Sequence, residues 1–285
     1  MTEVVGMGDD EVLLVQHVPL DSDVEDGPGI AVWTINRPDK LNALNSEVND
    51  AIIAAAKDVE KNDSVRVVII RGAPPPTPEE GERGMPPAFV AGADISEFVG
   101  VDSKQIRKAF KADPWAAVWN ISKPTIAMID GFALGGGCEL ALACDIRLAS
   151  TRSMFGTPEI NLGLIPGGGA TQRLARLVGY GKALEMVMSG ELMPATEAHR
   201  VGLANYVLPA EQLEEVTMTI ARNLAGKSPH TIRVAKRAVR AALERPLSEG
   251  VRFERDEFCA LFDTDDKEIG VQAFLDRSDP EWTGS

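Results

Sequence analysis

Residues 125–145 read TIAMIDGFALGGGCELALACD and join three local patterns in one stretch. The mostly apolar residues 125–129 predict a buried strand. Four glycines follow within residues 131–137, and the apolar residues 138–144 then predict a helix. Because the first amides of a helix have no partner within it, this turn can present N–H groups to an oxyanion. Glycine is also common in such turns for geometric reasons alone, so the stretch by itself leaves a ligand site open.

The same alternation of strand and helix patterns extends along the first half of the chain. Residues 45–61 predict a helix, because apolar residues recur there at helical spacing: Val48, Ile52, Ala55, Ala56 and Val59. Patterns typical of strands occupy residues 12–15, 30–35, 65–70, 88–90, 125–129 and 146–149. Strands that alternate with helices indicate an α/β fold with a largely parallel sheet and helices around it.

The chain divides by composition into a mixed core, residues 1–200, and a helical region, residues 201–285. Helical patterns in the C-terminal third cover residues 181–189, 209–225, 231–243 and 247–262. Within the core, residues 72–87 contain six prolines, which exclude regular structure. We expect these residues to form a surface insertion, because the strand pattern at 88–90 resumes directly after it.

Composition limits the classes of partner. Of 285 residues, 44% are hydrophobic and 25% are charged, as in ordinary globular proteins. The net charge of −14 disfavours nonspecific binding to nucleic acid or anionic membranes; whether it reflects a saline cytoplasm stays open. No apolar run reaches the roughly 18 residues that span a bilayer, and residues 1–6 lack a signal-peptide pattern. We expect a cytoplasmic enzyme with no nucleic-acid or membrane partner.

Two glutamates follow turns of this kind. Glu139 comes directly after the glycine turn, and Glu159 comes after Pro158. Two carboxyls that face one pocket can supply an acid and a base to one reaction. The alternative is that each glutamate stabilises the first turn of a helix, where acidic residues are favoured. Residues 88–95, AFVAGADI, end a strand in small residues and offer a second set of amides for an oxyanion.

Other chemistries lack their motifs. The glycine-rich turn at 163–174 has no Lys-Ser/Thr ending of a phosphate loop, and neither a dinucleotide fingerprint nor a G-x-S-x-G elbow occurs. Three cysteines and three histidines are scattered without ligand spacing, so no metal site is predicted. Two amide-rich turns and two carboxyls favour a reaction that polarises a carbonyl and moves protons beside it.

Taken together, these segments resemble the crotonase superfamily, the enoyl-CoA hydratase and isomerase family. The matching segments, in family order, are residues 36–44, 88–95, 131–145, 155–173 and 270–274. The resemblance implies a crotonase-like spiral of β-β-α units with a C-terminal α-helical trimerisation region. It also implies a homotrimer or homohexamer and an acyl-CoA substrate, so the CoA thioester is substrate and no metal or other cofactor is needed.

The resemblance assigns roles to particular residues. The oxyanion hole falls on the backbone N–H groups of Ala93 and Gly136. Glu139 is then the base that activates water toward C3, and Glu159 is the acid that protonates C2. Contacts to CoA fall on Lys40, Leu41, Ala43, Ala91, Gly92, Ala93, Asp94, Ile95 and Arg277. Arg277 stands where the family often has a lysine that meets a CoA phosphate from a neighbouring subunit.

Reversible syn hydration of a trans-2-enoyl-CoA is favoured, because family isomerases generally keep only the second carboxylate. The alternatives are a Δ3,Δ2-enoyl-CoA isomerase, a specialised acyl-CoA dehydratase, or an RNA-binding member of the family, which the acidic charge disfavours. Residues 96–119 are expected to form one wall of the acyl pocket. Within it, Trp115 and Trp119 either line the pocket or belong to the core, and the acyl chain itself is not determined by these patterns.

Overall fold

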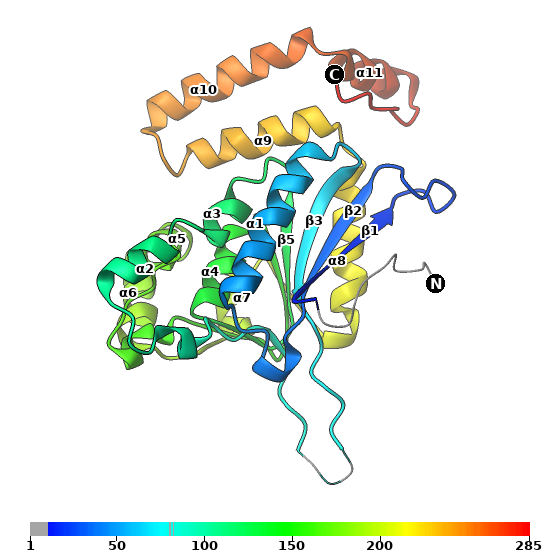
Figure 1. Ribbon diagram of the computed structural model, residues 1–285. Helices are drawn as coiled ribbons and strands as arrows, with labels where there is room; N and C mark the ends of the chain where they lie inside the picture. Colours follow the sequence, from blue (N-terminus) through cyan, green and yellow to red (C-terminus); the bar gives the residue numbers. More distant parts are fainter. Residues whose placement is uncertain (1–10, 80, 82) are drawn as a thin grey trace.

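A six-stranded sheet forms the centre of the molecule in the computed structural model, which describes residues 11–79, 81 and 83–285 (Figure 1). Its first two strands pair antiparallel and the remaining pairs are parallel. In spatial order the strands are β1 (Leu13–Pro19), β2 (Gly29–Ile35), β3 (Val65–Gly72), β5 (Thr125–Ile129), β7 (Ile146–Ser150) and β10 (Tyr206–Leu208). The predicted parallel α/β core is therefore confirmed.

A second, four-stranded sheet lies at the end of these strands. Its first three strands are parallel, and the last is antiparallel to its neighbour. In spatial order they are β4 (Ala88–Val90), β6 (Phe132–Leu134), β8 (Met154–Gly156) and β9 (Met193–Pro194). The sequence patterns identified only β4, because runs of two or three residues are too short to show a strand period.

The chain visits the two sheets in turn, which generates a spiral. Strands β3, β5 and β7 belong to the large sheet, and each is followed by one strand of the small sheet, β4, β6 or β8. Helices then return the chain: α2 (Ser103–Ala109) and α3 (Pro114–Trp119), then α4 (Gly136–Ala143), then α5 (Ala170–Leu177), α6 (Tyr180–Ser189) and α7 (Ala195–Arg200). This repetition is the predicted spiral of β-β-α units.

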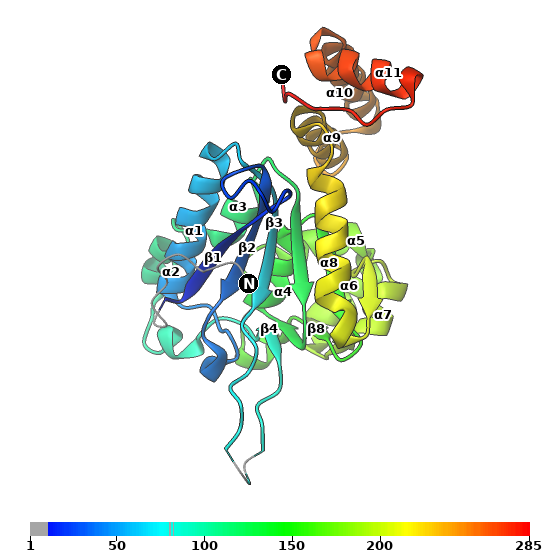
Figure 2. The same cartoon turned by 90° about the vertical axis from the view of Figure 1, so that its right-hand side faces the viewer.

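Helices cover both faces of the large sheet (Figure 2). Successive side chains of a strand point to opposite faces. In β3, Val67 and Ile69 pack in one apolar cluster with α8 (Ala210–Ala225), whereas Val68 and Ile70 pack in the other cluster with α1 (Ser46–Lys61). Strand β3 is thus buried on both sides, as the apolar run of its residues 67–70 predicts.

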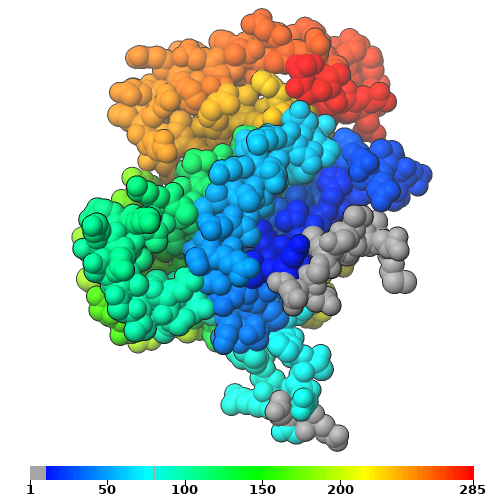
Figure 3. Space-filling view, viewed as in Figure 1, coloured from blue at the N-terminus to red at the C-terminus, as the bar shows by residue number. Residues whose placement is uncertain are grey.

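Three further helices and a short 3-10 helix form a layer above the sheet. They are α9 (Pro229–Ala241), α10 (Leu247–Ala260), η4 (Leu261–Asp263) and α11 (Asp265–Asp276). Figures 1 and 3 show this layer, in yellow to red, at the opposite end of the molecule from the extended loop of residues 73–87. The remaining 3-10 helices are η1 (Pro38–Lys40), η2 (Ile95–Phe98) and η3 (Pro158–Leu162).

Most predicted elements are present with shifted ends. The helix predicted at 45–61 begins at Ser46, because Asn45 is its N-cap and accepts from Val48 N. The predicted insertion, 72–87, begins one residue too early, because Gly72 is the last residue of β3; its described residues 73–79, 81 and 83–87 contain no helix or strand. Residues 1–6, which lack a signal-peptide pattern, lie outside the described residues. The division at residue 200 stays a prediction; β10 lies beyond it and pairs with β7 of the core.

Candidate active site

A cavity of about 560 Å³ brings the predicted catalytic groups together. Ala93 from the turn after β4, Gly136 and Glu139 from α4, and Glu159 from η3 all line it. The cavity lies where the spiral turns from the small sheet to the helices, so segments far apart in sequence meet there. The structure thus places all four residues in the lining of one cavity, while their catalytic roles stay predictions.

The two predicted oxyanion-hole amides lie next to each other. A Cβ placed on Gly136 would lie 3.6 Å from Ala93 N. Neither amide donates a hydrogen bond to any of the described residues. Close packing requires glycine beside them, because a Cβ at Gly137 would lie 2.0 Å from Val90 O. The geometry thus leaves two adjacent N–H donors open to the cavity.

Glu139 lies in the first turn of α4, and only 2% of it is exposed. Its Oε1 accepts from Gly168 N at 2.7 Å and from Ala170 N at 3.0 Å. The pKa of Glu139 is raised to about 7, mainly by burial and also by the nearby Glu159, while the two amide donors and Arg173 act in the opposite direction. A carboxyl with a pKa near neutrality is suited to act as a general base.

Glu159 faces the same cavity from η3. Burial raises its pKa as well, so the protonated form is favoured more than in water. Its Oε2 is buried and has no hydrogen-bond partner among the described residues. An unpaired buried carboxylate oxygen is costly, whereas a protonated one can donate to a substrate atom. Both glutamates are therefore more than helix-end residues, since the buried Glu139 and the half-buried Glu159 line the same cavity.

Two loops with predicted CoA contacts run side by side. Ala91 N donates to Leu41 O at 3.0 Å, and Asp94 N donates to Leu44 O at 2.7 Å. These bonds place Lys40, Leu41 and Ala43 beside the segment from Ala91, Gly92 and Ala93 to Asp94 and Ile95. The pairing of the two loops agrees with a shared ligand, although the contacts to CoA themselves stay predictions.

Two residues hold these loops and were assigned no role from sequence. Arg37 donates to Ala43 O at 2.7 Å and to Asp94 Oδ2 at 3.0 Å. Asn42, which is buried, donates from Nδ2 to Ala73 O and Ala88 O. Both residues lie within the matching segment 36–44. The sequence therefore pointed to this segment, but it did not show that these two side chains hold the loops together.

The walls of the cavity are mostly apolar. Helix α2 contributes Ile106 to the lining, and Phe110 follows as its C-cap residue; the loop after η3 contributes Leu164 and Ile165. Trp115 lines the cavity and donates from Nε1 to Gly136 O at 2.9 Å. These contacts place the predicted wall, residues 96–119, at an apolar site suited to a hydrocarbon chain.

The two tryptophans four residues apart have different surroundings. Unlike Trp115, Trp119 packs against arginines: the guanidinium of Arg173 lies 4.9 Å and that of Arg240 4.1 Å from its ring centre. The expectation that either both line the pocket or both are core was too simple. Helical spacing puts them on one face of α3, but that face meets two different neighbours.

Arg277 lies away from the cavity within one chain. It is exposed and caps α11 with φ +57°. Helix α11 belongs to the C-terminal layer, at the far end from the small sheet (Figures 1 and 2). The contact of Arg277 with the CoA of a neighbouring subunit stays a prediction.

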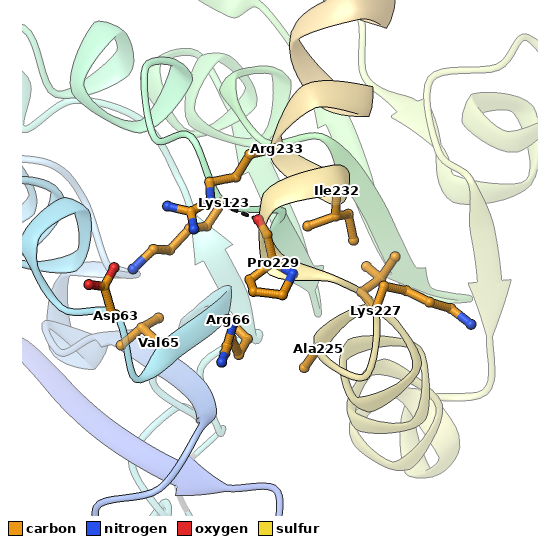
Figure 4. Close-up of a pocket in the computed structure, with 10 residues that line it drawn as sticks. Asp63, Val65, Arg66, Lys123, Ala225, Lys227, Pro229, Ile232 and Arg233 are labelled. Carbon is orange, nitrogen blue, oxygen red and sulfur yellow. Dashed lines mark hydrogen bonds between the residues drawn. The ribbon is translucent and has the colours of Figure 1, made fainter. Parts of the chain in front are cut away.

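Other hollows do not offer the same chemistry. Beneath the start of α9, basic side chains including Arg66, Lys123 and Arg233 surround a cavity of about 10 Å³ (Figure 4). Such a volume holds about one water molecule. A wider groove between β1 and α1 is lined by the carboxylates of Glu25, Asp26 and Asp58, among others, which disfavour an anionic ligand.

Residues 11–79, 81 and 83–285 also lack metal-binding groups and membrane-spanning helices. This part of the chain has no group of three or more His, Cys, Asp or Glu that could hold a metal ion. None of its helices is both long and apolar enough to cross a membrane. Cys138 and Cys144 are buried in or beside α4, and burial raises both thiol pKa values to about 12, so they pack as small apolar groups.

Comparison with known proteins agrees with the geometry. Residues 25–285 match the family model described as "Enoyl-CoA hydratase/isomerase". A protein of Mycobacterium tuberculosis named "Probable enoyl-CoA hydratase" is 38% identical over 263 residues, covering 91% of this chain and 96% of the relative. The "Short-chain-enoyl-CoA hydratase" of Clostridium acetobutylicum is 37% identical over 250 residues, covering 87% and 92%. The crystal structure of an enoyl-CoA hydratase from Bacillus anthracis superposes with a TM-score of 0.83 at 33% identity, covering 95% and 99%.

Proposed function

The chain belongs to the enoyl-CoA hydratase/isomerase family and is an enoyl-CoA hydratase, and we propose that Glu139 and Glu159 together perform its chemistry. The reaction is the reversible syn addition of water to a trans-2-enoyl-CoA, which gives the 3-hydroxyacyl-CoA. One observation carries the assignment of residues: the buried Glu139 and the half-buried Glu159, both with raised pKa values, face the same cavity as two adjacent amides that donate to none of the described residues.

The amides of Ala93 and Gly136 hold the thioester oxygen. That oxygen gains negative charge as the enolate develops, so donors already fixed in place stabilise the transition state more than the substrate. Loss of one such donor typically raises the barrier by roughly 3–4 kcal/mol. Because the donors belong to the backbone, geometry at these positions matters more than side-chain identity.

The two glutamates move the protons. Glu139, as a carboxylate, takes a proton from water while the water oxygen bonds to C3. The electrons of the C2–C3 double bond shift toward the thioester, and Glu159, as a carboxylic acid, gives its proton to C2. The sum is one water added, with one proton moved from Glu159 to Glu139 that exchanges back before the next turnover. Atoms and charges balance without any oxidant or reductant, and we propose that the reaction uses no resident metal or other cofactor.

CoA contacts are proposed along the paired loops. Lys40, Leu41 and Ala43 lie beside residues 91–95, and this pair of loops leads to the two amides. Lys40 is exposed and supplies positive charge near the proposed position of the CoA moiety. We propose that Arg277 of a neighbouring subunit completes the phosphate contacts.

A trimer, or a hexamer made of two trimers, is the proposed assembly. The C-terminal layer exposes large apolar side chains on successive helices: Leu247, Phe258, Phe262, Phe274 and Leu275 are each more than half exposed. Exposed apolar surface of this extent favours burial against another protein. A second copy is the proposed partner, because the resemblance assigns Arg277, at the end of α11 on the same layer, to the CoA of a neighbouring subunit.

A cytoplasmic location is proposed on chemical grounds. All three cysteines, including the exposed Cys259, are free thiols. Free thiols persist in reducing compartments.

Hydration of crotonyl-CoA, followed by loss of enoyl absorbance, tests the proposed function. Glu139→Gln and Glu159→Gln should each lower kcat by roughly 100- to 10,000-fold, since each removes one proton-transfer group. The exposed Glu215→Gln on α8 is the matched control and should keep the wild-type rate.

The outcomes separate the alternatives. A wild-type chain inactive on short and medium trans-2-enoyl-CoA but active on a 3-enoyl-CoA would replace the hydratase assignment with isomerase. Unchanged hydration by Glu139→Gln would refute its role as base.

A further inference from the structure

Arg173, near the start of α5, contacts the loop that holds Glu139. Its Nη1 donates to Gly168 O at 2.7 Å, while Gly168 N donates to Glu139 Oε1 at 2.7 Å. Gly168 is thus held on both sides, by the arginine at its carbonyl and by the carboxylate at its amide. A shift of this glycine would move or break the bond that orients Glu139.

The loop is shaped to receive this guanidinium. Gly169 has φ +108°, in the left-handed region that favours glycine. A Cβ at this position would lie 2.4 Å from Arg173 Nη1. Glycine at 169 therefore both permits the turn and leaves room for Arg173 to fold back over it.

Arg173 is held in place from its other side. Its guanidinium lies 4.9 Å from the ring centre of Trp119, which also contacts Arg240 at 4.1 Å. Arg240 donates to Asp145 Oδ1 at 2.7 Å, which anchors α9 to the end of α4. An aromatic ring next to a guanidinium restricts its position at modest energetic gain. Helices α3, α5 and α9 thus share in fixing one arginine.

We propose that Arg173 is a positioning residue for Glu139. By holding Gly168, Arg173 keeps the amides of Gly168 and Ala170 directed at Oε1, which leaves Oε2 to take the proton of water. Among the described residues no hydrogen bond reaches Oε2. This inference rests on the proposed role of Glu139 as base.

Arg173 also contributes to the charge balance at Glu139. The charged or titratable groups near this carboxyl are Glu159 from η3, Arg173 from α5 and the adjacent thiol of Cys138 on α4. Glu159 raises the pKa of Glu139, and Arg173 lowers it. Removal of the Arg173 charge should therefore move the ionisation of Glu139 to higher pH.

The test compares three variants by kcat, KM and the pH dependence of kcat. Arg173→Met should lower kcat about 10- to 100-fold with KM within about threefold, as expected for a displaced catalytic group. The acidic limb of the pH profile of kcat should move to higher pH in this variant. Arg173→Lys keeps the charge but not the fork of donors, so the limb should stay in place while kcat falls. Arg176→Met is the matched control: this exposed arginine lies one turn later, and both kinetic constants and limb should match wild type.

Thermal unfolding and inhibition by butanoyl-CoA confirm that each variant folds and binds thioester. An Arg173→Met enzyme with the kcat and acidic limb of Arg176→Met would overturn the inference. If Arg173→Met does not fold, Arg173→Lys decides, and a wild-type kcat for it would equally overturn the inference. Glu139→Gln separates the two levels: if it retains hydration, the proposed function fails, whatever Arg173 does.

Discussion

Glu139 and Glu159 are chemically identical side chains in different surroundings. Glu139 accepts two backbone N–H bonds, which stabilise its charged form, and Glu159 Oε2 has no partner among the described residues. The two N–H bonds favour the carboxylate form of Glu139, and the unpaired Oε2 of Glu159 favours its protonated form. The local hydrogen bonds thus agree with base and acid roles, respectively.

The rate of hydration should depend on pH as a bell. Glu139 must be ionised, so kcat/KM should rise as pH increases through about 7, its pKa. Glu159 must be protonated, so kcat/KM should fall once pH exceeds its raised pKa. Because the two groups interact, the apparent pKa values belong to the pair. Initial rates across pH 5 to 10 on crotonyl-CoA measure the profile; an acidic limb near pH 4.5, the value of an unperturbed glutamate, would contradict it.

Glu139→Gln should make the protein more stable while it removes activity. A folded-state pKa raised above the unfolded value means that stability is lost as pH rises from 4.5 through about 7. Glutamine removes that loss and can still accept from Gly168 N and Ala170 N. The Tm of the variant should therefore exceed wild type at pH 8, with the difference shrinking toward pH 5. A variant less stable than wild type at pH 8 would show that the amide bonds outweigh burial.

At the scale of elements, helix α4 and its neighbours position the site. All eight residues of α4 are buried, and the helix lies against β4 so closely that position 137 has room for glycine only. That contact brings the start of α4 to the turn after β4, where Ala93 lies. The two amides meet because a helix and a strand pack without side chains between them.

Helix α2 should influence which acyl chains fit. Phe110 lines the cavity with its ring centre 6.3 Å from that of Trp115, and a Cβ on Gly167 would lie 2.8 Å from Phe110 Cζ. Phe110→Ala should open this end, raising kcat/KM for a ten-carbon relative to a four-carbon enoyl-CoA by about three- to tenfold, equivalent to burying about one methylene more. Tyr180→Ala, an exposed aromatic outside the cavity lining, should leave the ratio unchanged. A ratio equal in both variants would show that α2 does not limit chain length.

At the scale of the molecule, the C-terminal layer carries the proposed subunit contacts. Phe274 on α11 is 84% exposed, which is unusual for phenylalanine in a monomeric protein. Phe274→Asp should shift the mass in sedimentation from three or six times 30.6 kDa toward one. Val24→Asp, a matched change at an exposed apolar residue before β2, should not. A wild-type chain that sediments as a monomer would refute the assembly.

Loss of the assembly should also weaken CoA binding, if Arg277 acts across subunits. The KM for crotonyl-CoA should rise in Phe274→Asp as its mass falls, with Val24→Asp again unchanged. An unaltered KM in a monomeric variant would remove Arg277 from the site.

The local sequence pattern was sufficient to predict those helices and strands that show a clear pattern in their own residues. The helix at 46–61 has five apolar residues on one face and an asparagine cap, and β3 contains the apolar run of residues 67–70, so both were predictable. Strands β6, β8 and β9 were not, because two or three residues show no period and pair only through neighbours supplied by other turns of the spiral. The different surroundings of Trp115 and Trp119 were not predictable either, because the cavity beside Trp115 and the arginines beside Trp119 come from other parts of the chain.

The sequence by itself determined the α/β class, the two glycine-containing turns, the two glutamates and, through the joint order of these segments, the family. Their chemistry depends on residues that lie far apart in the chain. The pKa of Glu139 is set by burial and by amides 29 and 31 positions away. The oxyanion amides meet through the packing of α4 on β4. Arg173 reaches Gly168 because Gly169 leaves room for its guanidinium and the ring of Trp119 packs against it. Burial and electrostatic interaction depend on distances in space, so only the tertiary structure decided how two ordinary glutamates come to share one cavity.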